Sequence, residues 1–141
     1  MLELKDYTVV TRELAFFRAS EEVVAADVET LAHAIASARQ WQAPLPVERS
    51  SGIIMDGNHR WHAARLLGLR RLPCILLDYA DARVRVVDWT SGQAYPVARI
   101  FQTIEAGQVL PYKSTRHSFA PLLPATAIPL DQLFAAGATP T

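Results

Sequence analysis

The sequence has one cysteine, no excess charge of either sign and no long apolar run. Because Cys74 stands alone, an intramolecular disulfide and a multi-cysteine zinc site are both excluded. A bilayer-spanning helix needs about 18 consecutive apolar residues, and no such run is present. The N-terminus is unlike a secretory signal, because Glu3 and Asp6 precede any apolar stretch. We therefore expect a cytoplasmic protein that does not contact a membrane.

The charged residues balance, with 14 Lys and Arg against 14 Asp and Glu, and 50% of the 141 residues are hydrophobic. This composition is typical of a globular protein and argues against disorder and against an extended nucleic-acid-binding surface. The length predicts a single domain over residues 1–141, in which 107–141 form a basic loop and a C-terminal extension. The sequence indicates no particular protein partner.

Apolar periodicity and turn residues predict a small α/β (α+β) fold, a mixed sheet with packed helices. Residues 26–41 carry apolar side chains at three- and four-residue spacing, which predicts a helix that Pro44 and Pro46 prevent from continuing. The apolar run at 52–55 predicts a strand that a turn joins to a helix at 61–67. Further predicted elements are strands at 74–77 and 84–89 and a helix at 97–106.

The densest polar cluster, Asp56-Gly57-Asn58-His59-Arg60, lies where this predicted strand gives way to the helix. Backbone N–H groups at a helix N-terminus favour an anion, and His59 and Arg60 add side-chain donors. Gly57 lets the backbone approach a ligand closely, and Asp56 could hold a divalent cation beside a bound phosphate. The cluster therefore predicts a phosphate site. The alternative is an ordinary helix start, in which Asp56 and Asn58 cap backbone donors and Arg60 pairs on the surface.

A second polar cluster at residues 110–117 combines two cations, a histidine and two hydroxyls in a loop broken by proline. Such a composition suits a carboxylate or a phosphate, although a solvated basic loop is the alternative. Glu21 and Glu22 precede the first predicted helix, where acidic residues commonly serve as caps. Trp89 is interpreted as a packing residue and Cys74 as a buried structural thiol.

Residues 54–64, Ile-Met-Asp-Gly-Asn-His-Arg-Trp-His-Ala-Ala, are followed by Leu67-Gly68 and Leu72-Pro73. This pattern resembles the signature of the ParB/sulfiredoxin-like superfamily, over about residues 5–79. The superfamily includes partition proteins that bind CTP and DNA, sulfiredoxins that use ATP, and free serine kinases. Sulfiredoxins carry a catalytic cysteine where this chain has Asn58, and partition proteins have a Gly-Glu-Arg-Arg type turn and an added DNA-binding domain. Neither pattern matches this chain.

Free serine kinases have an Asp-Gly-His-His-Arg turn, which this chain matches except at Asn58, and a later basic loop similar to residues 113–117. The resemblance implies a kinase that transfers phosphate from ATP or ADP, with Mg²⁺, to free L-serine or a similar small hydroxy amino acid. It also implies a catalytic glutamate at Glu21, although the adjacent Glu22 fits almost as well, and a serine pocket lined by Trp89. The main alternative is a non-catalytic ParB-like nucleotide-binding or regulatory module, and a purely structural or protein-interaction domain is a third.

The site that this resemblance implies has four parts, each assigned to numbered residues. The catalytic residues would be Glu21, Asp56 and His59, with Asp56 also the Mg²⁺ ligand. The nucleotide phosphates would bind Gly57, Asn58, His59 and Arg60. The serine substrate would bind Trp89, Lys113, Ser114, Thr115, Arg116 and His117.

Overall fold

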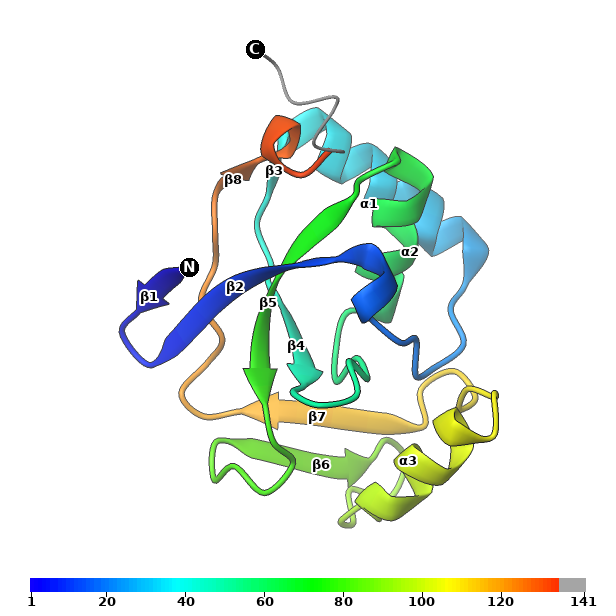
Figure 1. Cartoon of the computed structure of the whole chain (residues 1–141). Helices are drawn as coiled ribbons and strands as arrows, with labels where there is room; N and C mark the ends of the chain where they lie inside the picture. The colour runs from blue at the N-terminus through cyan, green and yellow to red at the C-terminus, as the bar shows by residue number, and fades with distance from the viewer. Residues whose placement is uncertain (135–141) are drawn as a thin grey trace.

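A four-stranded mixed sheet, flanked by helices, forms the centre of the computed structural model, which describes residues 1–134 (Figure 1). The strand order is β1-β2-β5-β4, with β2 antiparallel and β4 parallel to β5. Its strands are β1 (Leu2–Leu4), β2 (Tyr7–Glu13), β4 (Leu45–Glu48) and β5 (Arg71–Leu77). The three α-helices within these residues are α1 (Ala25–Ala38), α2 (Asn58–Leu67) and α3 (Val97–Glu105). The predicted mixed α/β architecture is confirmed.

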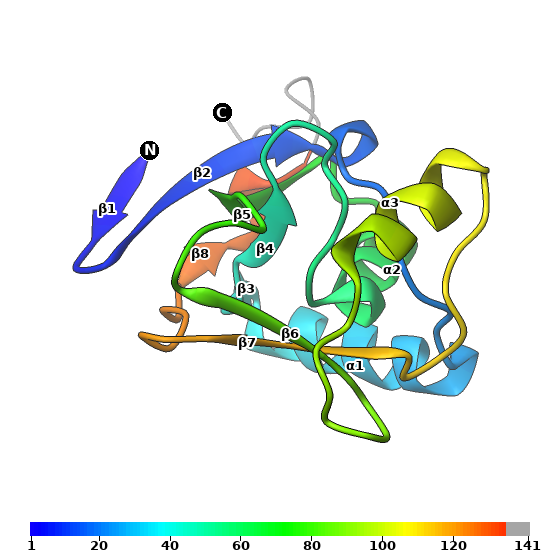
Figure 2. The same ribbon diagram turned by 90° about the horizontal axis from the view of Figure 1, so that it is seen from below.

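Two short ribbons complete the fold. The first pairs β6 (Val84–Asp88) with β7 (Thr115–Phe119), and the second pairs β3 (Gln40–Trp41) with β8 (Ile128–Pro129). Two short 3₁₀ helices, η1 (Leu14–Phe16) and η2 (Leu130–Gln132), lie between elements. In Figure 1, β4 and β5 run toward the β6–β7 ribbon, and Figure 2 shows β6 and β7 side by side along their length. This arrangement brings β7 near the start of α2.

The core forms because β5 is an almost continuous apolar run with neighbours on both sides. Leu72 and Cys74 of β5 belong to the same buried cluster as Val28 and Ile35 of α1 and Ala64 of α2. Burial of apolar side chains is the main favourable term in folding, so this cluster fixes both helices against the sheet. Within residues 1–134, no helix is long and apolar enough to cross a membrane.

Several predicted boundaries are wrong, each for a physical reason. The run at 52–55 is not a strand, because Gly52 has a φ of 76° and only Ile53 and Ile54 form isolated bridges. The first long helix ends at Ala38, since Arg39 is left-handed and Trp41 pairs in β3. The third strand ends at Asp88 and α3 at Glu105, each one residue earlier than expected.

The segment expected as a basic loop and extension contributes β7, β8 and η2, as far as residue 134. Both strands pair with earlier parts of the chain, β7 with β6 and β8 with β3. Its last residues, 135–141, lie outside the described residues. The described part of this segment is therefore built into the fold rather than appended to it.

Cys74 is fully buried in β5, between Val10 of β2 and Leu45 of β4, which confirms the expected structural thiol. Burial raises the pKa of the thiol to about 12, because the thiolate cannot be solvated there.

We expect Cys74 to resist a thiol reagent such as dithionitrobenzoate at pH 8 and to react at once in denaturant. Fast labelling of the native protein would contradict this packing.

Candidate active site

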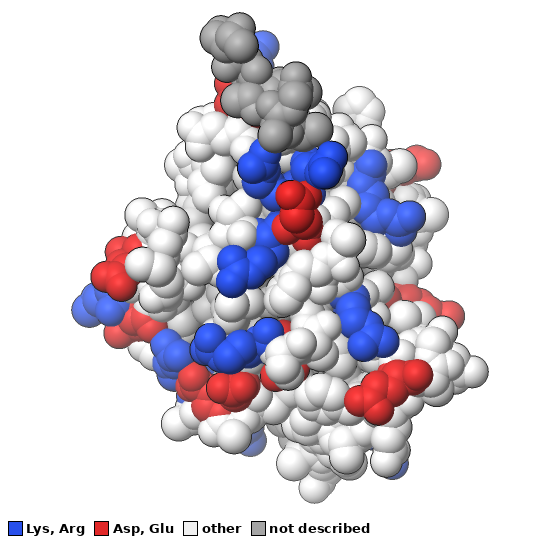
Figure 3. All heavy atoms as spheres, viewed as in Figure 1, with Lys and Arg blue, Asp and Glu red and all other residues white. Residues whose placement is uncertain are grey.

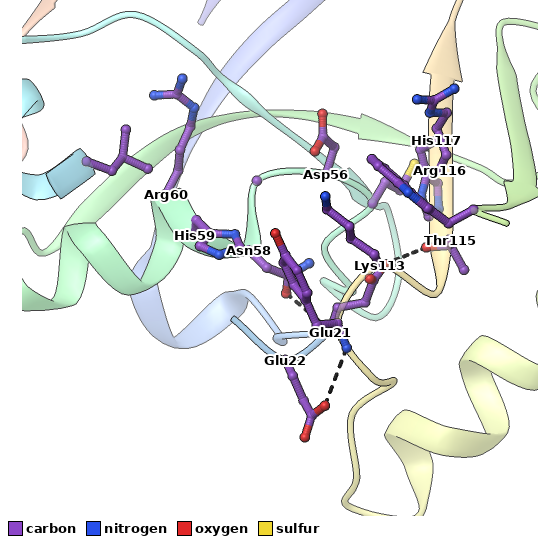
Figure 4. Close-up of a pocket in the computed structure, with 15 residues that line it drawn as sticks. Glu21, Glu22, Asp56, Asn58, His59, Arg60, Lys113, Thr115, Arg116 and His117 are labelled. Carbon is purple, nitrogen blue, oxygen red and sulfur yellow. Dashed lines mark hydrogen bonds between the residues drawn. The ribbon is translucent and has the colours of Figure 1, made fainter. Parts of the chain in front are cut away.

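A cavity of about 480 Å³ is lined by the polar clusters that the sequence predicts (Figure 4). Three segments meet there: residues 21–22 ahead of α1, residues 55–60 at the start of α2, and residues 112–117 leading into β7. The predicted site residues that line it are Glu21, Asp56, Gly57, Asn58, His59, Arg60, Trp89, Lys113, Thr115, Arg116 and His117. Leu31, Met55 and Tyr112 also line the cavity, although the sequence analysis assigned them no role in the site.

The N-terminus of α2 is open at one end of this cavity. Gly57 is the N-cap residue, with a φ of 100°, and no side chain caps the helix. The first intrahelical bond runs from Trp61 N–H to Gly57 O at 3.0 Å, so the N–H groups of residues 58–60 have no helical partner. The interpretation of Asp56 and Asn58 as helix caps is therefore wrong. Uncapped N–H groups at a helix start are suited to an anion.

Gly57 is required at this turn for two reasons. Its φ lies in the left-handed region, and an added Cβ would lie 2.4 Å from Cδ2 of Leu45. Leu45 is only 1% exposed, so its side chain has little room to move. We expect Gly57→Ala to lower the free energy of unfolding by about 1–3 kcal/mol and to weaken anion binding at the turn. Chemical denaturation and a phosphate titration would check both effects.

A matched control for Gly57→Ala is Gly92→Ala. Gly92 also has a positive φ, of 71°, but nothing lies within 4 Å of its added Cβ. The control therefore carries the backbone strain without the contact with Leu45. Equal losses of stability in the two variants would show that the contact is unimportant.

Asn58 and His59 both reach across to the segment that precedes α1. Asn58 Oδ1 accepts the Ser20 N–H at 2.8 Å, and its Nδ2 donates to Ser20 Oγ at 3.0 Å. His59 Nε2 accepts the Val24 N–H at 3.1 Å, which requires Nε2 to be unprotonated. Nε2 of His59 is therefore already hydrogen-bonded to the N-cap residue of α1.

Glu21 and Glu22 differ in their surroundings, although they are neighbours in sequence. Neither caps α1, whose N-cap is Val24 with no side-chain cap, so the capping interpretation is wrong. Glu21 is half-buried, and its two carboxylate oxygens accept the Ser114 N–H at 3.0 Å and the Thr115 hydroxyl at 2.5 Å. Glu22 is exposed and accepts only a long 3.4 Å contact from the Tyr112 N–H. The geometry holds Glu21 in one orientation at the cavity.

A cationic surface forms the wall opposite the turn. Lys113 Nζ lies 5.1 Å from the centre of the Trp89 ring, and the Arg116 guanidinium lies 4.7 Å from it. Trp89 is 40% exposed between these cations, so its interpretation as a packing residue is wrong. The three ion pairs among residues 1–134 involve other side chains, which leaves both cations without a salt-bridge partner there.

The predicted basic loop is only partly a loop, because Thr115, Arg116 and His117 belong to β7. A strand holds alternate side chains on opposite faces, and Thr115 is buried whereas Arg116 is exposed. Lys113 precedes the strand with a φ of 57°, a left-handed conformation uncommon for lysine. Ser114 does not line the cavity; it holds Glu21 through its N–H and donates its hydroxyl to Pro111 O.

His117 supplies an uncharged wall. Burial lowers its pKa to about 3, because the imidazolium would lose its hydration. Its Nε2 lies 2.9 Å from the hydroxyl of Tyr79, whose pKa is raised, also by burial. The pair is therefore neutral near pH 7, and the positive charge of the cavity comes from Arg60, Lys113 and Arg116.

Asp56 is the candidate ligand for the Mg²⁺ that the resemblance implies. Among the residues that the structure describes, no three His, Cys, Asp or Glu side chains gather as a metal site. Asp56 is an exposed carboxylate on the cavity wall and takes part in none of the ion pairs named above. Protein-bound Mg²⁺ commonly uses one or two carboxylates together with substrate phosphates and waters. Asp56 beside a phosphate-binding turn fits that pattern.

Charges are mixed on the face of the molecule that Figure 3 shows. Lys and Arg side chains there lie beside Asp and Glu side chains and do not form one continuous basic surface. Among the ion pairs of residues 1–134, Arg70 and Glu13 lie 3.0 Å apart, and Arg83 and Asp81 lie 2.7 Å apart. Paired cations of this kind are less available to an external polyanion than the unpaired cations of the cavity.

Comparison with known proteins finds L-serine kinases that match part of the chain. It is 37% identical to the ATP-dependent L-serine kinase of Desulfurococcus mucosus over 76 residues, which are 51% of this chain and 30% of that relative. It is 28% identical to the ADP-dependent L-serine kinase of Thermococcus kodakarensis over 88 residues, 60% of this chain and 36% of the relative. The matches thus span well under half of these kinases. No protein-family model matches the chain.

Solved structures extend the likeness to nearly the whole fold. A free serine kinase in complex with AMP has a TM-score of 0.81 at 16% identity, covering 92% of this chain and 95% of that one. In sequence, 47 residues are 43% identical to a ParB-like protein of Sulfolobus acidocaldarius, 33% of this chain and 24% of that protein. The chain therefore has the fold of the free serine kinase structure, and parts of its sequence are similar to L-serine kinases and to a ParB-like protein.

Proposed function

We propose that the protein transfers a phosphoryl group from ATP or ADP to the hydroxyl of free L-serine, forming O-phosphoserine. The observation that carries this proposal is one cavity that holds an uncapped helix N-terminus, a fixed carboxylate at Glu21 and two unpaired cations, Lys113 and Arg116. An anionic donor, a hydroxyl and a carboxylate are the groups that such a cavity can hold together. Two of the relatives named above are L-serine kinases, which supports the same reaction.

The nucleotide phosphates would lie at the start of α2, on the N–H groups of residues 58–60 and the Arg60 guanidinium. A second cavity, of about 290 Å³, shares Asp56, Gly57 and Arg60 with the first and is lined by prolines and apolar side chains. Pro44, Leu45 and Leu123 give this second cavity a surface suited to a flat base. Mg²⁺, held by Asp56, would neutralise charge on the phosphates.

The serine would lie between Glu21 and the cationic wall. Lys113 and Arg116 would bind its carboxylate, and the Glu21 carboxylate would orient its hydroxyl and accept the hydroxyl proton. The serine oxygen then forms a bond to the terminal phosphorus as the bond from that phosphorus to the leaving nucleotide oxygen breaks. Catalysis is chiefly positioning and charge neutralisation, as is usual for phosphoryl transfer.

A nucleotide-binding module without kinase activity is the second candidate. It is favoured by the 47-residue match to a ParB-like protein. Such a module would use the N-terminus of α2 and would have no need for a serine pocket. The two candidates therefore differ in whether the protein binds L-serine.

Calorimetry tests that difference directly. L-serine is titrated into the protein with Mg²⁺ and a non-hydrolysable ATP analogue, and separately into the protein alone. The kinase proposal predicts saturable binding of L-serine to the nucleotide-loaded protein, with weaker binding of L-alanine, which lacks the hydroxyl. Nucleotide binding without any heat from L-serine would favour the module and contradict the proposal.

Lys113 should control serine binding more than nucleotide binding. We expect Lys113→Asn to raise the KM for serine about 10- to 100-fold and the KM for the nucleotide less than about 2-fold, because a lost charge-assisted contact costs roughly 1.5–3 kcal/mol. Asparagine suits the replacement because it tolerates the left-handed backbone at this position, where φ is 57°. Initial-rate kinetics with each substrate varied in turn would measure both constants.

Lys5→Asn is the matched control, because Lys5 is the other lysine of the chain and lies in the turn between β1 and β2. It should leave both KM values unchanged. Equal rises in the serine and nucleotide KM values of Lys113→Asn would contradict the assignment of Lys113 to the serine carboxylate.

A further inference from the structure

Glu21 reaches the cavity from an irregular segment, so something must fix the backbone that carries it. Residues 17–24 form no helix or strand, apart from isolated bridges at Arg18 and Glu21. The bridge at Glu21 is made by its neighbours, since Leu110 N–H donates to Ser20 O at 2.9 Å and Glu22 N–H donates to Leu110 O at 2.8 Å. These two bonds use Ser20 O and Glu22 N–H. The N–H groups of Ser20 and Glu21 take no part in them.

The side chain of Asn58 binds these two N–H groups. Its Oδ1 accepts the Ser20 N–H at 2.8 Å and the Glu21 N–H at 3.4 Å, while its Nδ2 donates to Ser20 Oγ at 3.0 Å. Ser20 is only 4% exposed, and its hydroxyl donates to Ile54 O at 2.6 Å. Both ends of the Asn58 amide are thus engaged with one dipeptide, in a partly buried network whose members satisfy one another.

The placement of Asn58 links the two ends of the cavity. Asn58 is the first residue of α2, whose N-terminus would hold the phosphates, and its side chain holds the backbone of Glu21. The Glu21 carboxylate is fixed separately by Ser114 and Thr115. The main chain and the carboxylate of Glu21 are therefore held by two different segments, and the Asn58 segment is the one that carries the phosphate end.

We propose that Asn58 is a positioning residue for the phosphoryl transfer, whose side-chain amide ties the Ser20-Glu21 backbone to the start of α2 so that the Glu21 carboxylate faces the bound phosphate. This inference rests on the proposed function. It differs from the sequence-based assignment of the Asn58 side chain to the nucleotide phosphates. Misplacing a reacting group by about 1 Å can cost 10²-fold in rate, so a tether of this kind has a measurable effect.

The test is Asn58→Ala, with kinetics, nucleotide affinity and amide hydrogen exchange measured on the whole chain. We expect kcat to fall about 10- to 100-fold, while the KM for serine and the Kd for ADP change less than about 2-fold. The Ser20 and Glu21 amides, followed by NMR, should exchange faster in the variant, whereas the Leu110 amide keeps its protection. Gln102→Ala, an exposed amide truncation on α3, is the matched control.

Thermal unfolding would show whether Asn58→Ala folds. If it does not fold, Ser20→Ala tests the same hydrogen-bond network. It removes the hydroxyl that Nδ2 contacts but leaves the Ser20 N–H on Oδ1, so we expect a loss in kcat of only about 3-fold. If both variants fold, the double variant should be no slower than Asn58→Ala by more than about 2-fold, because both act through one tether.

Each other outcome overturns the inference. A rise in the ADP Kd with unchanged exchange of the Ser20 and Glu21 amides would make Asn58 a phosphate ligand. Faster exchange with an unchanged kcat would show that the tether is irrelevant to the reaction. If the unsubstituted protein forms no phosphoserine, the proposed function itself fails, and this result is distinct from an active protein in which Asn58→Ala is fully active.

Discussion

Glu21→Gln is expected to lower serine phosphorylation by about 10²- to 10⁴-fold, the range that a positioned general base contributes. Glutamine has the same shape, and its amide oxygen can still accept from Ser114 N–H or from the Thr115 hydroxyl, the two donors that hold Glu21. The variant should therefore fold and bind nucleotide normally. Single-turnover rates and a nucleotide titration separate the loss of chemistry from a loss of binding.

Glu22→Gln is the matched control and also resolves the ambiguity between the two neighbouring glutamates. Glu22 is exposed, and its carboxylate has only the 3.4 Å contact with the Tyr112 N–H. We expect Glu22→Gln to retain activity within about 3-fold, because exposed polar contacts contribute little. Loss of activity in Glu22→Gln but not in Glu21→Gln would reverse the assignment.

Asp56→Asn is expected to lower turnover by about 10²- to 10³-fold, because a metal that neutralises phosphate charge contributes several kcal/mol. The fold should be unaffected, since Asp56 is exposed and caps no helix. The remaining activity should require a higher Mg²⁺ concentration, because an amide is a weaker ligand than a carboxylate. Rates measured over a Mg²⁺ series would give both the maximal turnover and the metal requirement.

Asp6→Asn serves as the control for Asp56→Asn. Asp6 is an exposed carboxylate in the turn between β1 and β2, and it does not line the proposed site. Its replacement changes the net charge by the same amount and should leave turnover and the Mg²⁺ requirement as they are. Full turnover in Asp56→Asn at low Mg²⁺ would contradict the role given to Asp56.

The sequence was most informative where the chemistry is local. The turn at 56–60 could be found because a strand-like run, a glycine and a helical pattern follow one another. Its partner at 113–117 could be found because cations and hydroxyls are concentrated there. The sequence could not predict that these two clusters and Glu21 line one cavity. Glu21 and Thr115 are 94 positions apart and meet only in the folded chain.

The errors in secondary structure arise where tertiary pairing overrides local pattern. Residues 52–55 are apolar and β-branched like a strand, but Gly52 has a positive φ at the start of the run, and Ile53 and Ile54 form only one isolated bridge each. Pro46 argues against a strand, yet β4 is at the edge of the sheet, where a missing N–H is tolerated. Tyr112 belongs to the predicted cluster at 110–117, but its place beside His59, 5.9 Å between ring centres, could not be predicted because it depends on the fold.

Phosphorus NMR of the purified protein with Mg²⁺, L-serine and either ATP or ADP tests the central claim most directly. Parallel samples contain L-alanine, which lacks the hydroxyl, or no amino acid, so that transfer is distinguished from nucleotide hydrolysis. The proposal predicts a phosphoserine resonance that grows only with L-serine and in step with loss of the nucleotide's terminal phosphate. A folded protein that forms no phosphoserine with either nucleotide would contradict it.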